Sequence, residues 1–346
     1  MNDIKEHSFP FNLDILYEAA NISRGISIDA ISKAKSGHLG LPLGNAEIGA
    51  CLFGNCMIYN HKNPYWINRD RFVLSAGHGS MFLYSWLHLS GFKIHLKDIK
   101  NFRKLNSITP GHPEYDKSIG IECTTGPLGQ GVGNAVGMSI SSKMLSAKYN
   151  TKKYNIFDNN VICLLGDGCM QEGVTFESLS LAAHLKLDNL ILIYDYNNVT
   201  LDNLANKTQS EDVEKRFIAM GFNVYIIDGH NCYDFITTYN KIKSLKNNKP
   251  SIMICKTIIG KGIIEIEKTQ KAHGEFGIKY VEKTRTLLNL PKEKFYISSK
   301  VKKYFKYHQK ILYNNYKKWN DMFKKWSIEY PSLLKEFEND QKENSL

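Results

Sequence analysis

Two uninterrupted apolar runs, joined by a segment with helical spacing, constrain the fold of this chain more than any other feature. Residues 161–165 (VICLL) and 190–194 (LILIY) each have the length and composition of a strand that is buried on both faces. Between them, residues 175–186 repeat apolar side chains on one face of a helix. This order predicts neighbouring parallel strands. We therefore expect a doubly wound α/β fold with a mainly parallel sheet and helices on both faces.

Polar residues follow both predicted strands. The first run continues into Gly166-Asp167-Gly168, and the second is followed by Asn197 and Val199. Carboxyl ends of neighbouring parallel strands form the ligand-binding edge of open α/β sheets. The carboxylate of Asp167, the amide oxygen of Asn197 and the backbone carbonyl of Val199 suit a hard cation, and they leave about three positions of Mg²⁺ for phosphate oxygens and water. A lone Gly-Asp-Gly is usually only a turn, but the distance to Asn197, between two apolar runs, favours a cofactor site.

Three histidines occur in glycine-rich loops. His38 follows a helix predicted over residues 13–35. His78 follows a short predicted strand at 72–74, and His112 lies in a Pro-Gly-His-Pro segment. A single histidine beside glycine is usually a surface or capping residue. Three in succession, each in a tight loop that can approach a ligand, indicate a shared site. Imidazoles donate hydrogen bonds and move protons near neutral pH, which suits a phosphorylated, hydroxylated substrate.

Composition excludes several classes of protein. The chain has 346 residues and seven scattered cysteines, an odd number that indicates free thiols and a reducing, cytoplasmic location. No apolar run reaches the ~18 residues of a membrane span, so we expect no membrane association. The net charge is +11, but only six of the 45 basic residues are Arg. Nucleic-acid binders favour Arg for bases and phosphates, so we expect no nucleic-acid partner.

The segment 301–330 is rich in both lysine and aromatic residues. Such a mixture could bind single-stranded nucleic acid. The apolar residues, however, recur at spacings of three, four and seven, which indicates a helix with an apolar stripe that packs on the domain. The stripe consists of Phe305, Leu312, Tyr316, Trp319, Phe323 and Trp326. The polar tail from 337 to 346 is expected to fray.

Taken together, these motifs resemble transketolase. The similarity is carried by residues 35–40, 68–80, 109–114, 126–131 and 166–173, and residues from about 12 to 335 follow the first domain of that family in order. The resemblance implies a thiamine diphosphate-binding fold, thiamine diphosphate and Mg²⁺ as cofactors, and sugar phosphates as substrates. The implied reaction moves a two-carbon ketol unit from a ketose phosphate to an aldose phosphate.

The resemblance also implies a role for each matching residue. Asp167, Asn197 and the Val199 carbonyl would hold Mg²⁺ against the diphosphate. The residues implied to contact thiamine diphosphate are His78, Gly126, Pro127, Leu128, Gly168, Asn197 and His273. The residues implied to act in catalysis, at the border of cofactor and sugar, are His38, His112 and His273. Glu172 and Glu177 match carboxylates near the subunit interface of that family.

The chain departs from the family pattern at three places. Leu39 stands where the family usually has proline, and Tyr196 replaces an acidic residue beside Asn197. The loop 262–268, which precedes His273, is shorter and more charged than the family's usual pattern.

The expected organisation is a thiamine diphosphate-binding α/β domain over residues 1–275 and a helical extension over residues 276–346 that packs on the same domain. Transketolases carry the glutamate that activates the cofactor in a further, pyrimidine-binding domain. The expected partners are therefore a second copy, in a homodimer, or a second transketolase subunit with the complementary domains, and activity is expected only with those domains. The alternative is a non-catalytic cofactor-binding or regulatory protein.

Overall fold

The fold is built on a parallel five-stranded sheet. The computed structural model describes residues 11–245 and 247–343. The strands run in the order β1-β2-β3-β5-β4, and every neighbouring pair is parallel. They comprise β1 (Arg71–Leu74), β2 (Val161–Gly166), β3 (Leu190–Tyr196), β4 (Asn223–Asp228) and β5 (Ser251–Lys256). The predicted α/β fold with a parallel sheet is confirmed.

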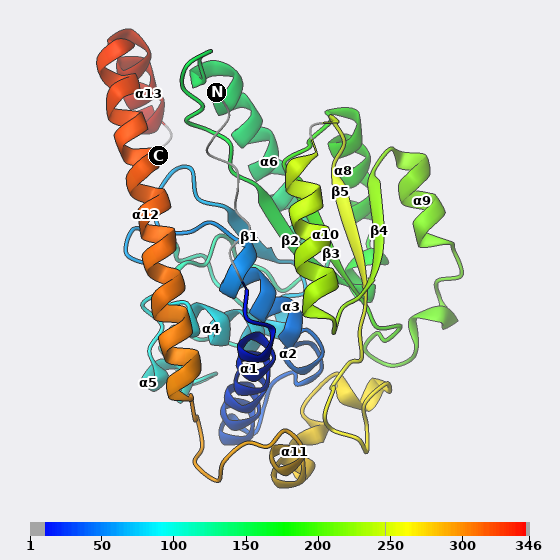
Figure 1. Cartoon of the computed structure of the whole chain (residues 1–346). Helices are drawn as coiled ribbons and strands as arrows, with labels where there is room; N and C mark the ends of the chain where they lie inside the picture. The colour runs from blue at the N-terminus through cyan, green and yellow to red at the C-terminus, as the bar shows by residue number, and fades with distance from the viewer. Residues whose placement is uncertain (1–10, 246, 344–346) are drawn as a thin grey trace.

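Helices cover both faces of this sheet (Figure 1). On one face α6 (Gln130–Tyr149) packs against α8 (Gly173–His184), and on the other α10 (Cys232–Ser244) packs against α1 (Leu13–Ala34) and α3 (Ala46–Cys51). Further helices are α2 (Gly40–Gly44), α4 (Ser80–Leu89), α5 (Leu96–Ile99), α7 (Asp167–Met170), α9 (Val213–Met220) and α11 (Val281–Leu287).

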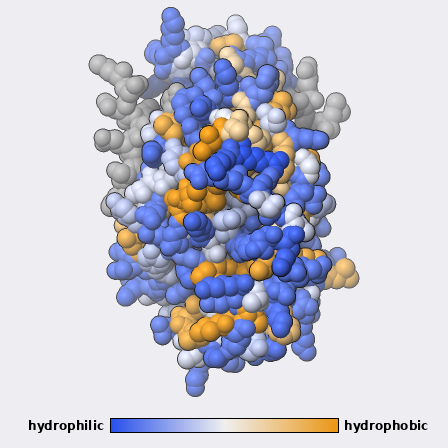
Figure 2. Space-filling model, turned by 90° about the vertical axis from the view of Figure 1, so that its right-hand side faces the viewer, coloured by the Kyte–Doolittle hydropathy of each residue, from blue (hydrophilic) through white to orange (hydrophobic). Residues whose placement is uncertain are grey.

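Burial along the strands follows their position in the sheet. The central strands β2 and β3 are buried over almost their whole length, as continuous apolar runs require. The edge strand β4 is only partly buried, and Ile226 is 43% exposed. The side of the molecule that carries β4 and α9 accordingly shows apolar patches among mostly hydrophilic residues (Figure 2).

The lysine- and aromatic-rich segment forms one long helix, α12 (Ser299–Glu329), which runs along one side of the molecule (Figure 1). The predicted apolar stripe faces inward, with Phe305, Leu312 and Trp326 buried. The prediction of a packed amphipathic helix is therefore confirmed. No helix among the described residues is long and apolar enough to cross a membrane.

The expected fraying of the C-terminal tail is wrong for residues 337–343. These residues belong to α13 (Pro331–Glu343), and Phe337 is 8% exposed. Phe337 packs edge-on against Tyr149 of α6, and Asp340 accepts hydrogen bonds from Tyr149 and Lys148. The helix is stable because this small aromatic cluster covers one face of it, which the polar composition did not indicate. Residues 344–346 lie outside the described part of the chain.

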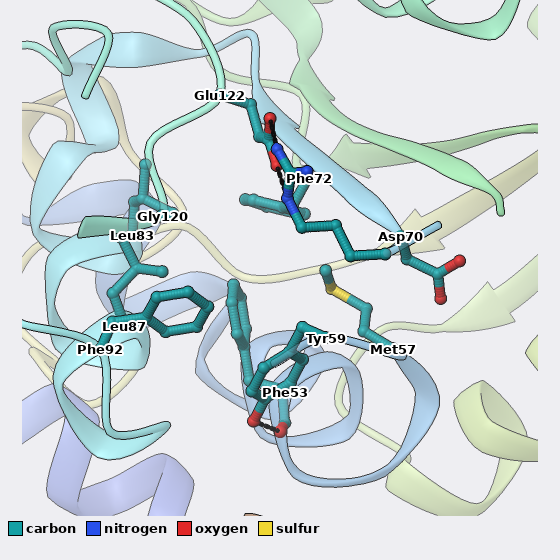
Figure 3. A pocket seen from close by; sticks show the side chains of 11 residues that line it. Phe53, Met57, Tyr59, Asp70, Phe72, Leu83, Leu87, Phe92, Gly120 and Glu122 are labelled. Carbon is teal, nitrogen blue, oxygen red and sulfur yellow. Dashed lines mark hydrogen bonds and ion pairs between the residues drawn. The ribbon is translucent and has the colours of Figure 1, made fainter. Parts of the chain in front are cut away.

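A small cavity lies beneath β1, and none of the predicted site residues lines it (Figure 3). Its volume is about 20 Å³, room for about one water molecule. Arg69 forms a bidentate ion pair with Glu122 in its wall, with distances of 2.9 and 2.7 Å. Burial lowers the pKa of Arg69 to about 10, although the Glu122 carboxylate opposes this shift. This cavity is a structural ion-pair site and is too small for a cofactor.

Candidate active site at the carboxyl edge of the sheet

The turn after β2 places a buried carboxylate at the carboxyl edge of the sheet. Asp167 opens the short helix α7 and is 2% exposed. Its Oδ1 accepts a hydrogen bond of 2.6 Å from the hydroxyl of Tyr194, and its Oδ2 accepts one of 3.2 Å from the backbone N–H of Asn197. The parallel register pairs Gly166 with Asp195, so the ends of β2 and β3 lie side by side. Asp167 and Asn197 therefore meet, as the sequence indicated.

The amide of Asn197 is held in one orientation. Its Nδ2 donates to Oδ2 of Asp195 at 2.9 Å, and its Oδ1 accepts from the backbone N–H of Val199 at 3.0 Å. Asp195 is itself buried and accepts a further hydrogen bond of 2.8 Å from Asn45. Because Asp195 can only accept, it determines which end of the Asn197 amide carries the oxygen. Asp195 and Asn45 were not identified from the sequence.

The electrostatics of Asp167 fit a cation. No lysine or arginine forms an ion pair with this carboxylate among residues 11–245 and 247–343. Burial raises its pKa to about 6, even though the Tyr194 hydroxyl stabilises the charged form. A buried carboxylate without a counter-charge, next to the oxygens of Asn197 and the 197–199 backbone, is a donor set for a hard cation.

Within the described chain, no group of three or more His, Cys, Asp or Glu side chains could hold a metal alone. The oxygens at this edge comprise one carboxylate and otherwise neutral groups. They would need an anionic ligand such as a diphosphate to complete the coordination and to balance the charge of a divalent ion.

The histidines of four separate loops converge. The ring centroid of His38 lies 5.2 Å from the centroids of His78 and His273 and 6.2 Å from the centroid of His112. His78 and His273 are 4.7 Å apart. The structure thus brings the three histidines of the glycine-rich loops together and adds His273. His273 is placed by backbone hydrogen bonds between its loop and the start of α2, from Leu39 N–H to Gly274 and from Gly40 N–H to His273.

All four imidazoles favour the neutral form. Burial is the main cause in each case; it lowers the pKa of His38 to about 4 and holds the pKa of His78 well below its usual value. The pKa values of His112 and His273 are also lowered by burial. The neighbouring histidines and Arg103 add to the effect at His38, because charges of the same sign disfavour a further proton. The cluster therefore presents neutral hydrogen-bonding groups at neutral pH.

The turn at 126–128 connects the histidine cluster with the Asp167 turn. A Cβ atom added to Gly126 would lie 3.6 Å from the His112 ring, and one added to Gly168 would lie 2.8 Å from Cδ1 of Leu128. A Cβ atom on Gly77, next to His78, would meet the backbone N of Gly126 at 2.8 Å. A side chain at Gly77 would collide with the backbone of this turn, so glycine is needed there, whereas the distance at Gly126 is an ordinary van der Waals contact. The predicted residues Gly126, Pro127, Leu128 and Gly168 thus lie between the two halves of the site.

Two buried polar atoms near the cluster have no hydrogen-bond partner among residues 11–245 and 247–343. They are Oγ1 of Thr125, which directly precedes the 126–128 turn, and Nε of Arg103, whose guanidinium contacts His38. An unpaired buried polar group is costly, and such groups are expected where a ligand supplies the missing partner. Arg103 was missed in the sequence because nothing local to it distinguishes it from a surface residue. Glu172 and Glu177, predicted near a subunit interface, are both exposed in this chain.

Comparisons with known proteins agree with this arrangement. The family model "Transketolase, thiamine diphosphate binding domain" matches residues 15–345. A transketolase of Dictyostelium discoideum is 53% identical over 331 residues, which cover 95% of this chain and 50% of that protein. A transketolase structure from Leishmania mexicana superimposes with a TM-score of 0.89 at 36% identity, covering 92% of this chain and 48% of that one. A Campylobacter jejuni transketolase structure gives 0.88 at 41% identity, covering 94% and 50%. The chain spans about half the length of the relatives it matches.

Proposed function

Since this chain belongs to the family of transketolase thiamine diphosphate-binding domains, we propose that it binds thiamine diphosphate through Mg²⁺ for the transfer of a two-carbon ketol unit from a ketose phosphate to an aldose phosphate. The observation that carries the proposal is the position of the uncompensated Asp167 carboxylate. It lies at one end of a site whose other end is a cluster of four neutral histidines, and the 126–128 turn lies between them.

In this proposal, Asp167, Asn197 and the Val199 carbonyl hold the metal. Tyr194 and Asp195 support it, because their hydrogen bonds orient Asp167 and Asn197. The residues that contact the cofactor are His78, Gly126, Pro127, Leu128, Gly168, Asn197 and His273. The bound cofactor supplies the electron sink for cleavage of the carbon–carbon bond.

The proposed catalytic residues are His38, His112 and His273. Their neutral rings can bind hydroxyl groups as donors or acceptors without a charge penalty, and they can exchange protons with a sugar. Partial burial of His38, His78 and His273 limits the contact of their rings with bulk water, whereas His112 is exposed. This protein's own contribution is therefore orientation and proton transfer.

The proposed organisation retains an α/β cofactor domain at residues 1–275 and a helical extension from 276, supported by the packing of α12 and α13 against the first part of the chain. The relatives are about twice as long as the matched region. We propose that the complementary domains act together with this region, in a homodimer or with a second transketolase subunit, in the cytoplasm. Sugar phosphates would be the substrates, with neither nucleic acid nor membrane as a partner.

The test of this proposal is an activity measurement with and without the complementary domains. A polypeptide of these 346 residues is expected to bind thiamine diphosphate weakly and to show essentially no ketol transfer from a ketose phosphate to ribose 5-phosphate. The resemblance places the activating glutamate outside this region, and loss of a positioned acid or base costs ~10²–10⁴-fold in rate.

Addition of the complementary transketolase domains is expected to restore turnover. Robust turnover by the 346-residue polypeptide alone would contradict the requirement for those domains. If the domains assembled with this chain, and the cofactor bound, but no ketol transfer followed, a non-catalytic cofactor-binding role would replace the enzymatic one.

Cofactor binding is also expected to depend on pH through Asp167. Its pKa in the folded, cofactor-free protein is raised to about 6 by burial, and a metal requires the ionised carboxylate. Below pH 6, protons therefore compete with Mg²⁺, and the apparent affinity should fall by about tenfold per pH unit, whereas above pH 7 it should level off. Calorimetric titration of Mg²⁺ with thiamine diphosphate between pH 5 and 8 measures this. A flat profile down to pH 5 would contradict the metal assignment.

A further inference from the structure

Arg103 is held rigidly beside the histidine cluster. Its backbone has a left-handed φ of 59°, and its N–H donates to the carbonyl of Thr109 at 3.1 Å. Nη1 donates to Oγ of Ser36 at 2.7 Å, and the guanidinium lies against Gly111, where an added Cβ would meet Nε at 2.8 Å. These contacts hold the guanidinium beside the cluster, and Gly111 leaves room for it there.

The guanidinium also lies over the ring of Phe102 and contacts the cluster. Nη2 lies 3.4 Å from Nδ1 of His38. An arginine has five N–H donors and no acceptor, and it stays charged in proteins. The contact therefore requires a lone pair on Nδ1 of His38. In a neutral imidazole the proton must then be on Nε2.

We infer that Arg103 is a positioning residue that fixes His38 as the neutral Nε2–H tautomer, so that His38 meets its ligand as a hydrogen-bond donor through Nε2 and not as a base. The tautomer follows from the contact between Arg103 and His38 alone. Its use toward a sugar rests on the proposed function. The inference distinguishes His38 from the other three histidines of the cluster, because only His38 among them has its tautomer set by a permanently charged neighbour.

The charges around His38 act in the same direction. The groups that act on it electrostatically are Arg103, His273 and His112, and its ring also meets that of His78 edge-on. None of them is a carboxylate, so none of these described neighbours stabilises an imidazolium. A second proton would have to enter on Nδ1, where it would replace the lone pair that accepts from Arg103 and would face a positive charge.

The test is nitrogen NMR spectroscopy of the 346-residue chain labelled with ¹⁵N-histidine. The signals of His38 are identified as those that disappear in His38→Gln. In the parent protein at neutral pH, Nδ1 of His38 is expected to have the shift of an unprotonated nitrogen and Nε2 that of a protonated one. A protonated Nδ1 in the parent would overturn the inference without reference to any variant.

Two variants and a control then separate an effect of Arg103 on the His38 tautomer from a general effect on packing. Arg103→Gln removes the charged donor. A hydrogen bond to a charged group favours one state by roughly 10- to 100-fold, so the Nδ1–H tautomer should become at least about tenfold more populated, and the pKa of His38 should rise. Ser36→Ala keeps the charge but removes the anchor of Nη1, and it should produce a smaller change in the same direction. Lys104→Gln, which removes an exposed charge next in sequence, should leave the His38 signals unchanged.

Unchanged His38 tautomer populations in a folded Arg103→Gln would contradict the inference. If Arg103→Gln did not fold, Ser36→Ala and the parent spectrum would still decide it. Neither result depends on cofactor binding, so failure of the proposed function and failure of this inference can be told apart.

Discussion

Replacement of Asp167 by alanine is expected to abolish Mg²⁺-dependent binding of thiamine diphosphate. Asp167 supplies the one carboxylate among the oxygens that we propose for the metal, and the variant would leave a divalent ion with only neutral protein oxygens beside a diphosphate. Loss of a residue that merely orients a metal ligand typically costs 10–100-fold in affinity, so loss of the charged ligand itself should exceed about 100-fold. Calorimetric titration with thiamine diphosphate in the presence and absence of Mg²⁺ measures the effect.

A matched control is Asp188→Ala. This carboxylate lies at the opposite, amino end of β3 and pairs with Lys143 at 2.7 Å, so its removal should not change cofactor affinity. If Asp167→Ala bound the cofactor as tightly as the parent, the metal site would have to lie elsewhere.

Replacement of Arg285 by alanine is expected to lower the free energy of unfolding by about 3–5 kcal/mol, because it would leave a buried carboxylate unpaired. Arg285 on α11 donates from Nη1 to both oxygens of Asp29 on α1, each at 2.7 Å, and Asp29 is 1% exposed. Burial raises the pKa of Asp29 even with this partner, which shows how poorly the site tolerates the charge. Arg285 also donates to the backbone carbonyls of Pro291 and Glu293, so the substitution would release the segment that follows α11.

Equilibrium unfolding in denaturant, followed by circular dichroism, measures this loss. Lys283→Ala provides the comparison on the same helix, since Lys283 is 63% exposed and pairs with Glu265 on the surface. Exposed ion pairs contribute about 0–1 kcal/mol, so this variant should unfold close to the parent. An equal loss in the two variants would mean that the Asp29–Arg285 pair contributes no more than a surface pair.

The sequence by itself determined the sheet and one half of the proposed site, the pair of Asp167 and Asn197. The apolar runs before Gly166 and before Asp195 could only be buried parallel strands, and the turns after such strands meet at one edge. That reasoning places Asp167 beside Asn197 without any knowledge of the rest of the chain. It succeeds because burial on both faces of a strand is a property of a few consecutive residues and because parallel strands end on the same side.

The amphipathic helix α12 could also be predicted from the sequence, because the period of its apolar residues is a local property. The tail after it was not. The polar residues that follow Phe337 gave no sign that α13 would be held on α6, since the partners, Tyr149 and Lys148, are almost two hundred residues away in the chain.

Only the tertiary structure decided the second half of the site. The glycine-rich loops and the family resemblance had predicted that the histidines share a site, but not the distances between their rings. The contact of Arg103 with Gly111 and the hydrogen bonds of Tyr194 and Asp195 to Asp167 and Asn197 had no local signature in the sequence. Loops have no repeating pattern of burial from which their approach could be read. Their positions follow from the packing of the helices and strands that carry them, and that packing exists only once the whole chain has folded.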